Sequence, residues 1–183
     1  HVTYFFNGCY ADPIAGEARR VIPSPDVKSY DATPAMSSKN LTKEVISNLT
    51  HNPLLSKERG NWKYDFTVLN LAAPDMIGHT GNLTAGVECC HKVDKYLGKI
   101  VKAYWRVGGT VLVTADHGNI EEMINLKTGE IDTEHSTNQV PFIVVNKNMG
   151  NKVKLRSSGV LGDIAPTILE LLGLDKPKEM TGK

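Results

Sequence analysis

The sequence predicts an α/β domain in which a mostly parallel β-sheet is covered by helices on both faces, giving a three-layer sandwich. Two observations support this prediction. Strand-like and helix-like segments alternate along the chain, and the strand-like segments are continuous apolar runs rather than alternating apolar and polar residues. Both patterns are typical of parallel sheets with two buried faces. The 183 residues, of which 40% are hydrophobic, suffice for one domain with a sizeable core.

Buried strands are predicted where β-branched and aromatic residues cluster between turn signals. These segments are residues 2–6, 65–71, 110–114 and 140–145. Pro141 has no backbone N–H to donate, so the last strand should begin near an edge or a bulge. A core strand at the very start, without an initiator methionine, leads us to expect that the chain was cut from something longer.

Amphipathic helices are predicted where apolar residues recur every three or four positions, in residues 38–50 and 82–105. The longer helix should end at the glycine pair 108–109. A shorter helix follows Asp163, whose carboxylate can cap its start, and Gly173 should close it.

The composition argues against several classes of protein. A net charge of +1 creates no strong field that would attract nucleic acid or a membrane surface. No apolar run reaches the length of a membrane span, and no signal peptide opens the chain. We therefore expect a cytoplasmic protein that binds neither nucleic acid nor membrane, with its three cysteines as free thiols.

Histidines and carboxylates follow the predicted strands. In open α/β sheets, ligands collect beyond the carboxyl ends of the strands. Asp75 and His79 follow the second predicted strand, Asp116 and His117 follow the third, and His135 precedes the fourth. The sequence therefore brings two aspartates and three histidines toward one edge of the sheet.

This set of side chains suits a divalent metal ion. Carboxylate and imidazole together favour Mn, Fe, Zn or Mg-like ions, and the lack of thiolate ligands argues against a structural zinc cluster. Asp75, His79 and His135 would give one ion three ligands and an open position, and Asp116 and His117 would give a neighbouring ion two. Two ions about 3.5–4 Å apart can clamp the attacking and leaving oxygens of a phosphoryl transfer. Each residue taken alone is equally compatible with a structural role, and the spacing does not name a reaction.

Neighbouring polar residues are open to two interpretations. One of Glu121 and Glu122 could orient a metal ligand, although carboxylates are favoured in the first turn of any helix. Asn119 could hydrogen-bond near the ions or only shape the turn.

Longer strings of sequence resemble a known family. These strings are HVTYFFNG, IPSPDVKSYD, PDMIGHTGN, GGTVLVTADHGNIEEM, EHSTNQVPFIVV, LGDIAPTILELLG and PKEMTGK. Together they resemble, over residues 1–183, the C-terminal half of the cofactor-independent (2,3-bisphosphoglycerate-independent) phosphoglycerate mutases. That family belongs to the alkaline-phosphatase superfamily, and PDMIGHTGN followed by TADHGN is its most specific feature here.

The resemblance implies a glycolytic isomerase that interconverts 3-phosphoglycerate and 2-phosphoglycerate through a phosphoserine. It implies two divalent ions, usually manganese, with Mg, Co or Zn as alternatives. Asp75, His79 and His135 resemble the family's ligands for one ion, and Asp116 and His117 resemble two ligands of the other.

The same resemblance implies that the chain is an incomplete alkaline-phosphatase-like fold. The nucleophilic serine would lie in an N-terminal segment, and the residues that grip the substrate in a transferase domain, both outside this chain. No catalytic residue is therefore expected within residues 1–183, and the isolated chain should be inactive. The full-length enzyme is expected to be a monomer that acts on a small molecule.

The sequence departs from the family pattern without losing a predicted ligand. Cys9 stands where the family commonly has a second glycine, and Asp132 where members often have a histidine. Three other functions remain open: another metalloenzyme of the superfamily, such as a phosphatase, phosphopentomutase or sulfatase; a metal-binding fragment without catalysis; and a structural domain whose five candidate ligands bind nothing.

Overall fold

The computed structural model describes residues 2–50, 64–150 and 153–183, which fall into two compact units, His1–Lys147 and Asn148–Lys183. The helices of the first unit are α1 (Val2–Phe6), α2 (Ser38–Thr50), α3 (Ala73–Gly78) and α4 (Leu83–Arg106), with short 3-10 turns η1 (Tyr30–Ala32) and η2 (Ile120–Glu122). Its strands are β1 (Val111–Val113) and β2 (Ile143–Val145). The second unit holds η4 (Leu161–Asp163) and α5 (Ile164–Leu172).

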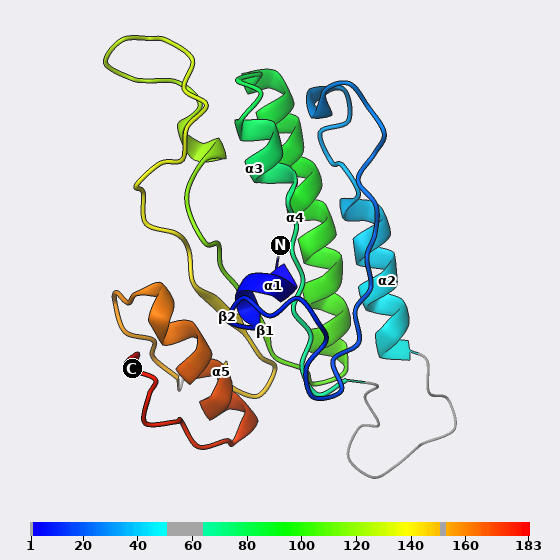
Figure 1. Cartoon of the computed structure of the whole chain (residues 1–183), viewed down its shortest axis with the longest axis vertical. Helices are drawn as coiled ribbons and strands as arrows, with labels where there is room; N and C mark the ends of the chain where they lie inside the picture. Colours follow the sequence, from blue (N-terminus) through cyan, green and yellow to red (C-terminus); the bar gives the residue numbers. More distant parts are fainter. Residues whose placement is uncertain (1, 51–63, 151–152) are drawn as a thin grey trace. The chain divides into compact units, whose positions relative to one another are not determined.

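The long helix α4 forms where the sequence predicts it. The side chain of Asn82 caps its start by accepting a hydrogen bond from the backbone N–H of Ala85 (3.1 Å). Gly108, with φ of +79°, adopts the left-handed conformation just after its end, which confirms the predicted stop. The helices α2 and α3 pack alongside α4, and Figure 1 shows the three side by side.

The core of the first unit lies between α3 and α4. Ala73 and Ile77 of α3 meet Ala85 and Cys89 of α4, and all four are buried. Burial raises the pKa of the Cys89 thiol to about 12, so this cysteine is an inert part of the core.

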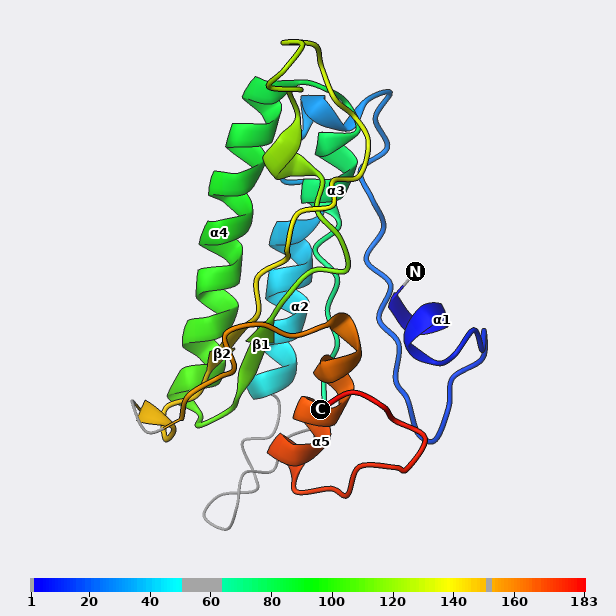
Figure 2. The ribbon, with the colours of Figure 1, turned by 90° about the vertical axis from the view of Figure 1, so that its left-hand side faces the viewer.

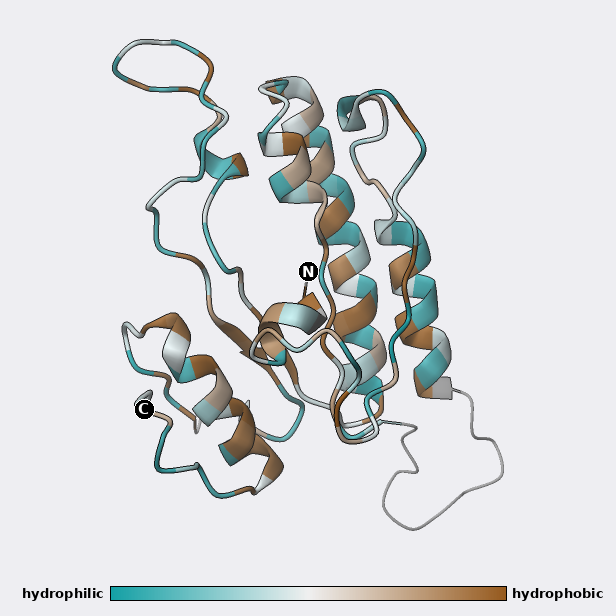
Figure 3. Ribbon diagram, viewed as in Figure 1, coloured by the Kyte–Doolittle hydropathy of each residue, from teal (hydrophilic) through white to brown (hydrophobic). Residues whose placement is uncertain are grey.

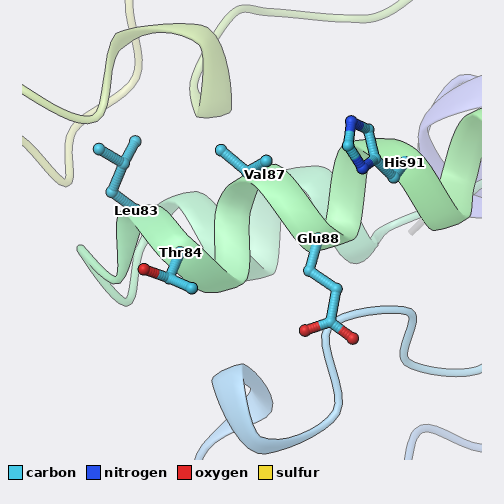
Figure 4. A pocket seen from close by; sticks show the side chains of 5 residues that line it. All are labelled: Leu83, Thr84, Val87, Glu88 and His91. Carbon is cyan, nitrogen blue, oxygen red and sulfur yellow. The ribbon is translucent and has the colours of Figure 1, made fainter.

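The apolar spacing indicated the buried face of α4 correctly at Val93 and Ile100 but not at the start of the helix. Hydrophobic residues recur along the helix (Figure 3), yet Leu83 and Val87 are about half exposed. They line an open hollow with Thr84, Glu88 and His91 (Figure 4). The small residues Ala85 and Gly86 are buried instead, because α3 and η2 approach the first turns of the helix closely.

The predicted parallel sheet does not form among the described residues. β1 and β2 lie side by side (Figure 2) and pair antiparallel, with Val111 opposite Val145 and Val113 opposite Ile143. Both were predicted as strands, and Pro141 lies outside β2, but this one pair does not show the mostly parallel arrangement that was expected. Residues 65–71, which were also predicted as a strand, form neither a strand nor a helix.

The prediction of a strand over residues 2–6 was also wrong, because these residues form helix α1. A strand needs a neighbouring backbone for its hydrogen bonds, whereas a helix satisfies them within the segment. Apolar composition indicates burial but does not supply that neighbour, and Phe5 remains 67% exposed. The turn after α1 places Cys9 at φ of +69°, a conformation that the family's glycine would adopt without strain.

In the second unit, α5 ends at Gly173, whose φ of +71° confirms the predicted stop. Asp163 does not cap α5 with its side chain as predicted. Its carboxylate accepts hydrogen bonds from the backbone N–H groups of Lys183 (2.7 Å) and Val160 (3.0 Å) and pairs with Arg156 (2.9 Å). These bonds, that from Lys183 above all, lower the pKa of Asp163. No helix within the described residues combines the length and apolarity that a membrane crossing requires.

The packing of α3 on α4 can be tested by truncating Ile77, which has no exposed surface. We expect Ile77→Ala to lower the free energy of unfolding by about 2–5 kcal/mol, because a cavity replaces packed methyl groups. Leu126→Ala is the control, because Leu126 is 95% exposed; it should cost about 0.5 kcal/mol or less. Urea denaturation measures both, and equal losses would contradict the described core.

Candidate metal centre

Helix α3 presents Asp75 and His79 on one face. Pro74 sits in its first turn, where its missing N–H costs no hydrogen bond. Residues four apart lie one above the other on a helix, which brings Asp75 Oδ1 to 3.3 Å from His79 Nε2. Because Ala73 and Ile77 bury the opposite face in the core, both polar side chains remain partly exposed.

His135 completes a triangle of ligand atoms. Its Nε2 lies 3.3 Å from Asp75 Oδ1 and 3.2 Å from His79 Nε2, although it comes from a distant part of the chain. Atoms spaced in this way leave a point about 1.9 Å from each of the three, close to the distances of about 2.0–2.2 Å at which imidazole and carboxylate bind zinc-like ions. The predicted grouping of these three residues is therefore present, with the geometry of a three-ligand site.

A backbone carbonyl fixes the tautomer of His79. Its Nδ1 lies 2.7 Å from the carbonyl oxygen of Thr133, which can only accept, so Nδ1–H donates to it. The Nε2 lone pair is then directed into the triangle, as metal-binding histidines require. The sequence did not single out Thr133, because no side-chain pattern marks a residue that acts through its carbonyl.

Asp116 and His117 lie beside this triangle rather than in it. The ring of His117 stacks on that of His135, with centroids 3.7 Å apart and planes at 20°. Asp116 Oδ2 is 3.8 Å from His117 Nε2, and its side chain is 90% exposed. The structure therefore places both residues next to the three-ligand site, where they are available to a second ion but do not enclose one.

Asn119 connects the turn after β1 to α3. Its side chain is buried, and its Nδ2 donates a hydrogen bond to Asp75 Oδ1 (2.8 Å). A Cβ at Gly78 would overlap the Asn119 amide, so this contact depends on glycine at that position. Of the two roles considered for Asn119, the structure favours the one beside the ligands.

A β-bridge between two loops brings His117 and His135 together. The backbone N–H of Ser136 donates to the carbonyl of Gly118 (3.0 Å) in an antiparallel bridge. The Glu121 carboxylate accepts hydrogen bonds from the Asn119 N–H (2.8 Å), the Ser136 hydroxyl and the Asn138 side chain (3.2 Å). The contribution of Ser136 was missed in the sequence, where it could have been sought only through its place next to His135.

These hydrogen bonds determine the charge of Glu121. Burial opposes ionisation of its carboxyl group, but the bonds from Ser136, from its own backbone N–H, from Asn119 and from Asn138 together outweigh burial and lower the pKa from an ordinary 4.5 to about 2. The group is therefore an anion under all physiological conditions.

The site and the fold define a class of protein. A family model described as the metalloenzyme superfamily matches residues 1–176, and the chain belongs to that superfamily. Over its whole length the chain is also similar to 2,3-bisphosphoglycerate-independent phosphoglycerate mutases, which confirms the resemblance seen in the sequence.

Among these relatives, the mutase of Clostridium kluyveri is 47% identical over 183 residues, which are 100% of this chain and 33% of that protein. The mutase of Clostridioides difficile is 46% identical over 182 residues, 100% of this chain and 34% of that protein. A solved structure of Leishmania mexicana phosphoglycerate mutase at low cobalt concentration superposes with a TM-score of 0.83 at 28% identity, covering 100% of this chain and 34% of that chain. The chain thus spans about a third of the length of the proteins it matches.

The ionisation of Glu121 can be followed by carboxyl ¹³C NMR. Because its pKa is lowered, Glu121 should stay largely ionised at about pH 3.5, where an ordinary glutamate is mostly protonated. Its contribution to stability is fully present above about pH 4.5 and is lost as the pH falls through about 2. Ser136→Ala removes one donor and should raise the pKa of Glu121. Titration of the wild-type group near 4.5 would show that the hydrogen bonds are absent.

Proposed function

We propose that the chain is the metal-binding part of a phosphoglycerate mutase that interconverts 3-phosphoglycerate and 2-phosphoglycerate in glycolysis. The observation that carries this proposal is the triangle of Asp75, His79 and His135 in a chain similar to such mutases from end to end. The parent protein would be an isomerase of the cytoplasm, a monomer, and a binder of neither nucleic acid nor membrane.

The proposed site holds two divalent ions, with manganese as the expected metal. Asp75, His79 and His135 would bind one ion and leave a position open, and Asp116 and His117 would bind its neighbour. Bound ions neutralise phosphoryl oxygens and lower the pKa of a serine hydroxyl that attacks phosphorus. This chain's own contribution is orientation: Thr133 fixes the His79 tautomer, and Asn119 holds the Asp75 carboxylate.

The serine nucleophile is proposed to lie outside this chain, which spans about a third of its relatives' length. The phosphoryl group would pass from one hydroxyl of the glycerate to that serine and then to the other hydroxyl. A further acidic ligand for the second ion would accompany the serine. A separate transferase domain would grip the substrate and exclude water, which would otherwise hydrolyse the phosphoserine.

We propose that the same missing segment completes the fold. Added strands would extend the short sheet into the mostly parallel, three-layer sandwich of the alkaline-phosphatase superfamily. The superposition of the chain on about a third of the Leishmania mexicana mutase supports this arrangement.

Metal binding is testable on the 183-residue chain. We expect saturating Mn²⁺ to raise the melting temperature, because a ligand at about 100 times its Kd stabilises the native state by about 2.7 kcal/mol. His79→Ala and His135→Ala should weaken Mn²⁺ binding at least about tenfold, since each removes one of three ligands. His91→Ala is the matched control, because His91 is exposed on α4 in the hollow of Figure 4.

The outcomes separate the proposed function from its alternatives. A structural domain would show no stabilisation by Mn²⁺, Mg²⁺, Co²⁺ or Zn²⁺, and equal loss in the His91 and His135 variants would place the ion elsewhere. Ion binding without turnover is expected for the isolated chain. Mutase activity of purified 183-residue protein, free of host enzyme, would contradict the assignment of the nucleophile to a missing segment.

A further inference from the structure

Two loops that carry site histidines are joined by a backbone bridge between Ser136 and Gly118, by a hydrogen bond between Asn138 and Glu122, and by the carboxylate of Glu121. The turn after β1 bears His117 and continues into η2, which contains Glu121. The segment that bears His135 continues into Ser136 and Asn138. Glu121 receives the Asn119 N–H from its own turn (2.8 Å), and the Ser136 hydroxyl and the Asn138 amide (3.2 Å) from the other segment. Its two oxygens thus span the gap between the loops.

The Glu121 carboxylate packs closely against the turn that bears His117. A Cβ at Gly118 would overlap both Ser136 Oγ and Glu121 Oε1, so the carboxylate lies directly against the backbone of the turn. All three donors are neutral, so hydrogen-bond geometry rather than an ion pair determines where the carboxylate lies. Hydrogen bonds to a charged acceptor are roughly twice as strong as neutral ones, which suits this carboxylate to holding two loops together.

The contacts of Glu121 extend to both sides of the metal centre. Through the Ser136 hydroxyl it holds the residue next to His135, whose ring stacks on His117 at 3.7 Å. Through the Asn119 N–H it holds a buried residue whose side chain donates to Asp75 Oδ1 (2.8 Å). One carboxylate therefore constrains the stacked histidines and, through Asn119, the aspartate of the three-ligand site.

We propose that Glu121 is a positioning residue that fixes the separation of the two metal sites by clamping the His117 turn to the His135 segment. This inference rests on the proposed metal centre and deepens it. Glu121 touches neither ion nor substrate; it acts through Asn119 and Ser136. Removing the Glu121 carboxylate should leave the side chains of all five candidate ligands unchanged but allow the two loops to separate.

The test uses Co²⁺, whose affinity is measured by calorimetry and whose visible absorption at saturation reports coordination geometry. Glu121→Gln keeps the size of the side chain but cannot accept all three hydrogen bonds, and Ser136→Ala removes one of the contacts between the loops and leaves the backbone bridge and the Asn138 bond in place. We expect Glu121→Gln to weaken Co²⁺ binding about 10- to 100-fold, with a smaller loss for Ser136→Ala and an altered spectrum in both. The matched control is Glu122→Gln, since the Glu122 side chain bonds Asn138 (2.8 Å) rather than Asn119 or Ser136, and its backbone bond to the Asn119 carbonyl (2.9 Å) is kept in the variant; it should bind like wild type.

Wild-type affinity and spectrum in both Glu121→Gln and Ser136→Ala would overturn the inference while leaving the metal centre intact. An equal loss in Glu122→Gln would overturn it too, because it would assign the effect to general charge. Failure of the wild type to bind Co²⁺ would instead remove the proposed function, and the clamp with it. Circular dichroism of the metal-free variants detects unfolding. If Glu121→Gln does not fold, the Co²⁺ affinity and spectrum of Ser136→Ala test the inference.

Discussion

The site depends on the convergence of three electron-rich atoms. Asp75 Oδ1, His79 Nε2 and His135 Nε2 lie 3.2–3.3 Å apart, and the tautomer of His79 turns a lone pair toward the other two. A proton on His135 can serve only one of these contacts at a time, whereas a divalent cation would meet all three. The Asn119 amide supplies a donor to Asp75 Oδ1 (2.8 Å), but a divalent cation would satisfy the three atoms together, as expected for a member of a metalloenzyme superfamily.

Rigid packing behind the site holds the segments that carry these three atoms in place. Ile77 and Cys89 are fully buried where α3 meets α4, so the helix that carries two of the ligands cannot shift independently. Met123, just after η2, packs against Gly86 of α4 and fixes the other loop to the same support. Each ligand thus comes either from a helix anchored in the core or from a loop tied to that helix, which is the arrangement that precise metal sites need.

Local features could be predicted from the sequence, and features that depend on a distant partner could not. The long helix and its glycine stop follow from spacing within one segment, whereas the short helix α3, which places Asp75 and His79 on one face, was not predicted. Residues 2–6 were misjudged because a strand is defined by its neighbour, which composition does not reveal. The start of α4 was misjudged for the same reason. Leu83 and Val87 fit the apolar spacing of a core face, but packing against α3 buries Ala85 and Cys89 instead.

Gly78 and Gly118 would donate no atom to the proposed ions, yet the candidate centre depends on both. Gly78 leaves space for the Asn119 amide, and Gly118 for Glu121 and Ser136. A sequence signature for this site must therefore include Gly78 and Gly118 as well as the residues that supply ligand atoms. Chains that retain every histidine and aspartate but carry a side chain at either glycine would match a ligand motif while lacking the room to assemble it.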